Sequence, residues 1–202
     1  MKIIALFVGK PRTLTVAGAT FRSGGAKTSV ESAFLRFDGF DDDGPANLKY
    51  HGGRDRTACV YPLEHYAWWK QIHDFDLGPG SFAENLTVEG ALEDVLCIGD
   101  LVRIGEALAQ VSLPRDPCGT LDRLTGIAGF GAMARDAGKC GFHMRTLEEG
   151  IVRAGDAFEL VERDPARFTV AVALDLYHGR ARDPALARRL FAIPALAEQG
   201  RR

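Results

Sequence analysis

The chain has 202 residues, 46% of them hydrophobic, and a formal net charge of −2. This composition is ordinary for a globular protein with a hydrophobic core. The near-neutral charge gives no reason to expect a nucleic-acid or membrane partner, and no run of about 18 apolar residues is present to cross a bilayer. The four cysteines are widely spaced and form no C-x-x-C pair, so neither a zinc site nor a disulfide scaffold is indicated, and a reducing cytoplasm is expected.

The first part of the chain is predicted to be strand-rich. Residues 1–9 are β-prone, whereas residues 11–26 are small and turn-rich and are expected to form a loop. The β-branched and aromatic residues of 28–37 predict two short strands or one bent strand. Residues 38–45 contain three consecutive aspartates. We interpret this segment as an exposed loop, because no metal-ligand spacing accompanies the carboxylates.

A glycine pair, Gly52 and Gly53, precedes a short apolar strand predicted at 57–61. Basic side chains flank the pair: His51, Arg54 and Arg56. Glycines let backbone N–H groups point inward and arginines add fixed positive charge, which is the chemistry of an anion-binding cradle. A tight turn with exposed arginines explains the same residues equally well. The residue pattern leaves both interpretations open.

Two further features follow in the middle of the chain. Pro62 suits the first turn of a helix, and helical periodicity continues to His73, with Trp69 on the face expected to pack. A glycine- and proline-containing turn then leads into a strand predicted at 85–88, with Glu84 and Asn85 at its entrance. An Asn amide both donates and accepts hydrogen bonds, which suits a heterocycle edge or a phosphate, but an Asx turn is the plain alternative.

The alternating pattern of 98–105 predicts a strand that turns back into a second strand at 107–113. A similar phrase, A-G-D-A-F-E-L-V, recurs at 154–161 and indicates an equivalent strand. A helix at 130–137 and a strand at 140–147 complete the segment. Short strands joined by short turns are typical of a closed barrel or a bent sheet, so we expect a mainly β fold with some α, built as a closed or partly closed β-barrel.

The last part of the chain is predicted to be helical, with a boundary at Asp164 and Pro165. The expected organisation is a β-barrel domain at 1–164 and a three-helix tail at 165–202. Asp183 followed by proline marks a helix start, with aspartate as the N-cap. A unit of this size is too small to bury a core alone, so it should dock on the barrel or on a partner. It lacks the basic face of a DNA-binding helix.

One thiol stands on a stiff corner between the strand ending near Leu113 and the next helix. Cys118 follows Pro117 in P-R-D-P-C-G, and proline fixes the backbone so that the thiol is held in place. Arg115 lies three residues away and favours the thiolate. Cys59 and Cys97 lie in apolar runs and are expected in the core. For Cys140 both a core position and a functional role are left open. A cysteine-protease mechanism would need a histidine brought to Cys118, and His51 or His143 would have to serve.

Four motifs in this order resemble the MOSC family, the homologues of the C-terminal domain of molybdenum cofactor sulfurase. They are H-G-G-R-D-R-T-A-C-V-Y (51–61), G-P-G-S-F-A-E-N-L-T-V-E-G (78–90), I-G-D (98–100) and P-R-D-P-C (114–118). The helical tail and R-T-L-E-E-G-I-V-R-A-G-D (145–156) also fit stand-alone bacterial members, in particular the 6-N-hydroxylaminopurine resistance proteins. The chain differs from the family pattern at Ala83, where relatives usually have glycine, and at Thr120, where relatives often have lysine.

The resemblance implies a barrel that binds the molybdenum cofactor, a pyranopterin with a terminal phosphate. Cys118 would be the molybdenum ligand or would carry sulfur as a persulfide. The residues implied to bind the cofactor are His51, Gly52, Gly53, Arg54, Arg56, Glu84, Asn85 and Arg115. Relatives of this type reduce N-hydroxylated bases and related N-oxygenated small molecules with electrons from a separate flavin reductase. No motif for pyridoxal phosphate or zinc is present in the sequence.

Three functions remain open at this point. The first is an enzyme, a molybdenum-dependent reductase with Cys118 as metal ligand. The second is a carrier of sulfur, as a persulfide on Cys118, or of the cofactor, without turnover. The third is an interaction module whose site has decayed, which the differences at Ala83 and Thr120 keep open. The substrate, the electron donor and the oligomeric state are left open by the sequence. A dimer is one of the oligomeric states considered.

Overall fold

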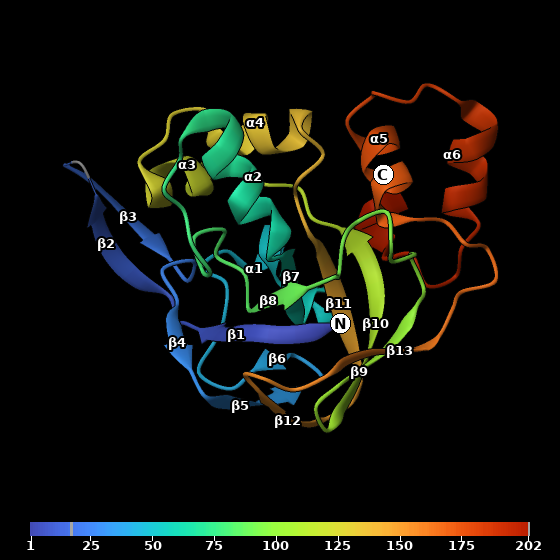
Figure 1. The fold of residues 1–202 in the computed structure, drawn as a ribbon, viewed down its shortest axis with the longest axis horizontal. Coiled ribbons are helices and arrows are strands. Elements are labelled where there is room, and N and C mark those ends of the chain that lie inside the picture. Colours follow the sequence, from blue (N-terminus) through green and yellow to red (C-terminus); the bar gives the residue numbers. More distant parts are fainter. Residues whose placement is uncertain (17, 202) are drawn as a thin grey trace.

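The structure, a computed structural model, describes residues 1–16 and 18–201, and a long bent sheet dominates it (Figure 1). The strands of this sheet are, in spatial order, β13 (Phe158–Glu162), β9 (Leu101–Ile104), β10 (Ala107–Pro114), β11 (Phe142–Glu148), β7 (Ala58–Pro62), β8 (Leu86–Glu89), β1 (Lys2–Val8) and β4 (Thr28–Val30). Neighbouring strands run antiparallel, except that β7 runs parallel to β8. The fold is therefore mainly β, as the sequence predicts.

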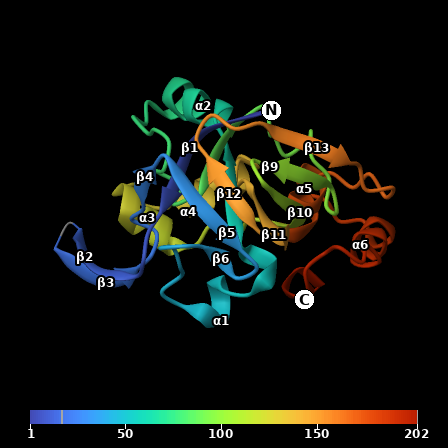
Figure 2. The same cartoon turned by 90° about the horizontal axis from the view of Figure 1, so that it is seen from below.

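Two smaller sheets lie at the edges of the large one. One contains β12 (Gly150–Arg153), β5 (Ser32–Arg36) and β6 (Gly39–Phe40), and it lies below the large sheet in Figure 1. The other is a hairpin of β2 (Arg12–Val16) and β3 (Ala19–Ser23), which projects from the body of the molecule in both views (Figures 1 and 2). The prediction of a loop at 11–26 is wrong. The β-branched residues of this segment pair across the hairpin, where the hydroxyls of Thr15 and Thr20 lie 3.1 Å apart.

The closed or partly closed β-barrel expected from the sequence is not confirmed. Among the described residues, β13 and β4 end the sheet order without pairing with each other, and a single bridge between Lys2 and Ala157 links β1 to the segment before β13. The reason lies in β1 itself. Its edge facing away from β8 pairs with β4 at residues 6–8, so only its first residues meet the segment 155–158. The sheet bends strongly but does not close.

Helices cover one end of the sheet and support its core. They are α1 (Leu48–His51), η1 (Arg54–Arg56), α2 (Glu64–His73), α3 (Gly119–Thr125) and α4 (Phe130–Asp136). Trp69 of α2 is fully buried and donates from Nε1 to the Tyr61 hydroxyl of β7 at 2.8 Å. Phe82 stacks on Tyr61 with ring centroids 3.8 Å apart, and Phe130 of α4 packs against both Trp69 and Phe82. This aromatic core fixes α2 and α4 over the sheet.

The C-terminal segment contains α5 (Val170–Tyr177), α6 (Pro184–Phe191) and a short 3₁₀ turn, η2 (Glu198–Arg201). The predicted start of α6 is confirmed, since the Asp183 carboxylate accepts from the N–H groups of Ala185 and Leu186. The segment shares the main hydrophobic cluster, and Ala197 N–H donates to the Ser112 carbonyl of β10 at 3.0 Å. In the part of the chain that is described, no helix has the length and apolarity needed to cross a membrane.

Candidate functional site

The corner that presents Cys118 forms where β10 meets α3. Pro114 ends the strand, and Cys118 is the N-cap residue of α3, with an extended backbone at φ −107° and ψ 170°. The Cys118 thiol is half-buried, whereas Cys59, Cys97 and Cys140 are buried. Its Sγ atom lies 3.9 Å from Nε2 of His51, at the end of α1. Of the two histidines named from the sequence as possible partners of Cys118, the structure places His51 beside the thiol.

The surroundings of Cys118 favour its ionised form. Hydrogen bonding from His51, then from the hydroxyl and the backbone N–H of Thr120, lowers the pKa of the Cys118 thiol to about 6, against the opposing effect of burial. Burial instead raises the pKa of Cys140 to about 12 and raises the pKa values of Cys59 and Cys97. Cys118 is thus the thiol, among the described cysteines, that is a thiolate at neutral pH.

Cys118 opens onto a cleft of about 350 Å³ that is rich in positive charge. The charged residues that line it are Arg22, Lys27, Asp43, Arg56, Arg115, Asp116 and Arg123. Both carboxylates are already paired, Asp43 with Lys27 and Asp116 with Arg135, the latter at 3.6 Å. The remaining guanidinium groups leave the cleft suited to an anionic ligand.

Three buried polar atoms at this cleft have no hydrogen-bond partner. They are Nη1 of Arg115, Nε of Arg56 and Nδ1 of His143. Burial, together with the neighbouring Arg56 and Arg115, holds the pKa of His143 well below its usual value, so its imidazole is neutral. Buried donors are almost always satisfied in folded proteins. Their unused hydrogen-bonding capacity indicates that a polar ligand completes the site.

Asn85 lines the cleft, but its amide is occupied by protein partners. Its Oδ1 accepts from the Cys59 N–H at 3.0 Å, and its Nδ2 donates to the Phe7 carbonyl at 3.1 Å and to the Asp43 carboxylate at 2.8 Å. Asp43 also accepts from the Gly9 N–H at 2.8 Å and from Lys27. Asn85 therefore braces the cleft wall, and Asp43 is a site residue that the sequence reasoning missed. Its position in an acidic run gave no local signal for this role.

Glu84 lies outside the cleft and is completely buried. Its carboxylate accepts hydrogen bonds from the Tyr66 hydroxyl at 2.6 Å, the Thr87 hydroxyl at 2.7 Å, and the N–H groups of Gly80 and Phe82. These bonds close the turn at 78–84. The preceding residue, Ala83, does line the cleft. Its φ of 56° lies in the left-handed region that favours glycine. Glu84 is thus a support for the cleft wall.

The glycine pair does not form an anion cradle around the cleft. The Gly52 N–H ends α1 by donating to the Leu48 carbonyl at 3.1 Å, so it is not free for a ligand. Arg54 covers the Phe37 ring at 5.3 Å, and Gly53 likewise lies outside the cleft lining. Of this segment, His51 and Arg56 reach the cleft. The glycine pair instead ends the helix that places His51 beside Cys118.

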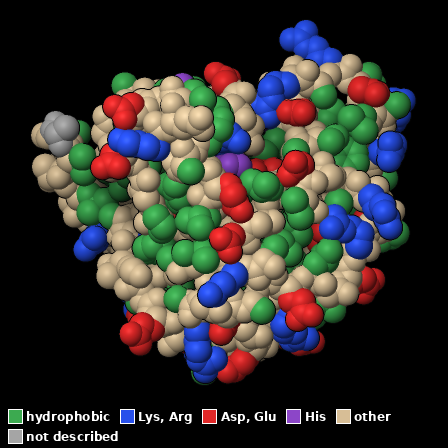
Figure 3. Space-filling model, in the orientation of Figure 1, with side chains coloured by type: hydrophobic (Ala, Val, Ile, Leu, Met, Phe, Trp, Pro, Cys, Tyr) green, Lys and Arg blue, Asp and Glu red, His purple; other side chains and the backbone are tan. Residues whose placement is uncertain are grey.

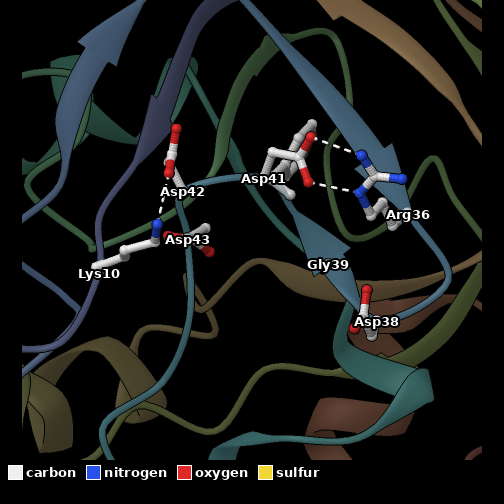
Figure 4. A pocket seen from close by; sticks show the side chains of 8 residues that line it. Lys10, Arg36, Asp38, Gly39, Asp41, Asp42 and Asp43 are labelled. Carbon is white, nitrogen blue, oxygen red and sulfur yellow. Dashed lines mark hydrogen bonds and ion pairs between the residues drawn. The ribbon is translucent and has the colours of Figure 1, made fainter.

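The three consecutive aspartates of the acidic loop, Asp41, Asp42 and Asp43, are bound by basic side chains. Figure 4 shows Asp41 facing Arg36, with an Oδ1–Nε distance of 2.6 Å, and Asp42 facing Lys10 at 2.7 Å. Within residues 1–16 and 18–201, no cluster of three or more His, Cys, Asp or Glu side chains is arranged to hold a metal ion. Asp41 and Asp42 are exposed, as the loop interpretation expects. Asp43 is partly buried instead and lines the cleft.

The chain belongs to the MOSC family, whose domain matches residues 47–159. It is 37% identical over 200 residues to the uncharacterized protein YflK of Bacillus subtilis, covering 98% of this chain and 90% of that protein. The crystal structure of YiiM from Geobacillus stearothermophilus superposes with a TM-score of 0.84 at 30% identity, covering 99% of this chain and 95% of that one. A protein named Reductase from Gibberella moniliformis is 32% identical over 127 residues, 59% of this chain and 22% of that protein.

The structure shows the surroundings of Ala83 and Thr120, the two residues at which the sequence was expected to differ from the family. The backbone at Ala83 has the conformation for which glycine is the usual residue, so the methyl group is tolerated at some cost. Thr120 lines the cleft, and its hydroxyl stabilises the Cys118 thiolate. Neither substitution removes the cleft or the exposure of the thiol.

Proposed function

We propose that the protein binds the molybdenum cofactor in this cleft and reduces N-hydroxylated bases or related N-oxygenated compounds. The observation that carries the proposal is the Cys118 thiolate, which opens onto a cationic cleft whose buried donors have no protein partner. Family membership supports the cofactor, and the relative named Reductase supports the class of reaction.

The residues of the cleft fit the cofactor chemically. A thiolate is a soft ligand suited to a soft metal centre, and Cys118 is the thiol that is ionised at neutral pH. Nη1 of Arg115 and Nε of Arg56 offer charge-assisted donors to a phosphate group. The neutral imidazole of His143 adds a further polar contact. We expect Cys118 to hold the metal and Arg115 and Arg56 to hold the phosphate.

When bound, the cofactor would supply the two-electron redox chemistry that removes oxygen from the substrate. Reduction of an N–OH group to N–H consumes two electrons and two protons and releases water. A separate flavin reductase would supply the electrons. His51 is placed to hold a proton at Nε2 beside Cys118 and to give it to the departing oxygen. The half-buried position of Cys118 limits the access of bulk water.

The proposal is tested by metal and pterin analysis of protein purified from a host that makes the cofactor. Wild-type protein is expected to contain close to one molybdenum and one pterin per chain. Cys118→Ala should lose the metal, whereas Cys97→Ala, which changes a buried thiol outside the cleft, should retain it. Metal-free wild-type protein with an intact fold would refute the proposal and favour an interaction module.

A second function is favoured by the same low pKa of Cys118. The Cys118 thiolate can attack the outer sulfur of a persulfide on a cysteine desulfurase and release the desulfurase thiolate, so that Cys118 carries the sulfur as a persulfide. Mass spectrometry after incubation with a cysteine desulfurase and free cysteine distinguishes this role. The carrier predicts one added sulfur atom on Cys118 and no reduction of N-hydroxylated compounds.

A further inference from the structure

Helix α4 lies directly against the corner that carries Cys118. A Cβ atom added at Gly131 would lie 3.3 Å from the Cys118 carbonyl oxygen and 3.4 Å from the Pro117 carbonyl oxygen. Arg135, at the other end of α4, donates from Nη1 to the same Pro117 carbonyl, and it pairs with Asp116 at 3.6 Å. Three consecutive residues of the corner are thus in contact with one helix.

Helix α4 is itself held at both ends. At its start, the Asp122 carboxylate accepts from the N–H groups of Gly129 at 3.0 Å and Gly131 at 2.8 Å. At its end, Arg180 donates from Nη1 to the Arg135 carbonyl, where a helix end favours a cation. The Arg180 Nε in turn donates to Asp175 of α5 at 2.7 Å. These contacts form a continuous path from α5 through α4 to the corner.

We propose that the C-terminal helices hold the Cys118 thiol in its working position through Arg180 and Arg135. Neither arginine lines the cleft, so both are positioning residues that act through the Pro117–Cys118 peptide. The inference rests on the proposed function only in taking Cys118 as the functional group. It gives the C-terminal segment a role in the site, although the described residues of that segment, up to residue 201, contribute nothing to the cleft lining.

The physical reason is the narrow geometry of the contacts made by the thiol. Sγ lies 3.9 Å from His51 Nε2, which is near the limit for a hydrogen bond to sulfur. Release of the Pro117 carbonyl would let the corner move and carry Sγ away from His51 and Thr120.

The Arg135 guanidinium suits this task better than an ammonium group would. It contacts the Pro117 carbonyl and the Asp116 carboxylate together, which uses the planar fork of several donors. A lysine at this position would keep the charge but could not span both partners in the same way. Partial rescue by Arg135→Lys is therefore expected.

The test measures the rate at which iodoacetamide alkylates Cys118 in cofactor-free protein at one neutral pH, with the site identified by mass spectrometry. Arg135→Met and Arg180→Met should both slow the reaction, by about tenfold for Arg135, because Sγ is no longer held in its position beside His51. Arg135→Lys should recover part of the rate. Arg189→Met, which changes an exposed arginine of α6, should match wild type.

The outcomes separate this inference from the proposed function. An unchanged or faster rate in Arg135→Met would overturn the inference, and an effect confined to Arg135→Met would overturn the role of the C-terminal helices. If Arg180→Met does not fold, Arg180→Gln provides the same comparison, with thermal unfolding as the check. Slower alkylation in protein that never acquires molybdenum would support the inference while refuting the proposed function.

Discussion

Cys118 Sγ lies 3.9 Å from His51 Nε2, although 67 positions separate the two residues in the sequence. The contact joins the N-cap of α3 to the end of α1, and both residues line the cleft. The contact favours the thiolate form of Cys118 at neutral pH, and both the reductase and the sulfur-carrier functions depend on that ionisation.

Replacing His51 by Gln should raise the pKa of Cys118 from about 6 toward its ordinary value, because the largest stabilising contact of the thiolate is lost. At pH 7 the thiol should change from about nine-tenths ionised to a minor fraction. Absorbance of the thiolate near 240 nm, followed against pH, measures the shift. His73→Gln is the matched control, since His73 packs on Trp69 away from the cleft. An unchanged midpoint in His51→Gln would contradict the assignment.

The lowered pKa of Cys118 also makes the stability of the fold depend on pH. Because the folded state lowers the pKa of Cys118, its contribution to stability is complete above the pKa of the unfolded thiol and disappears as the pH falls through about 6. Urea unfolding of wild type and Cys118→Ala at pH 5 and pH 8 should therefore show wild type gaining relative to the variant at the higher pH. Equal differences at the two pH values would argue against a native thiolate.

Arg115→Gln should weaken cofactor binding by at least about tenfold, because one charge-assisted donor to the phosphate is lost. The measurement is the molybdenum and pterin content of the variant after identical expression. Arg54→Gln serves as control, since Arg54 lies outside the cleft and covers Phe37. Full cofactor content in Arg115→Gln would place the phosphate elsewhere.

Glu84→Gln should destabilise the fold by about 2–4 kcal/mol without removing the ionised thiol. The carboxylate is completely buried and accepts four hydrogen bonds, and an amide would oppose one of these donors with its own N–H group. Urea denaturation measures the loss, and alkylation of Cys118 checks the site. A large loss of thiol reactivity with unchanged stability would reverse the interpretation of Glu84 as a support.

Ala83→Gly tests the cost of the left-handed backbone at this position. Relief of that conformation is worth about 1–2 kcal/mol, against about 0.8 kcal/mol for the lost burial of the methyl group. We therefore expect a small net gain in the free energy of unfolding. Ala91→Gly, at a buried alanine that is absent from the positive-φ residues, should lose stability. Loss of stability in Ala83→Gly would show that the methyl group matters more than the backbone.

Local sequence patterns predicted correctly those features of the fold that depend on neighbouring residues alone. The turn between β9 and β10, the Asp183 cap of α6 and the proline-stiffened corner at Cys118 each depend on neighbouring residues, and the structure confirms them. The fully buried Trp69 also agrees with its predicted packing role.

The remaining features depend on contacts between distant segments. Asp43 reaches Asn85 across 42 positions, and Arg180 reaches Arg135 across 45. Neither pair has a spacing that marks it in the sequence, because the packing of distant segments in the fold brings the partners together. The open sheet has the same origin, since it follows from which strand pairs with each edge of β1.

The most direct test of the central claim is X-ray absorption at the molybdenum K-edge of protein loaded with the cofactor. The claim predicts that wild type shows one more sulfur neighbour around molybdenum than Cys118→Ser, with the pterin content of the two proteins compared in parallel. An identical sulfur count in the two proteins, both holding the metal, would contradict Cys118 as the ligand.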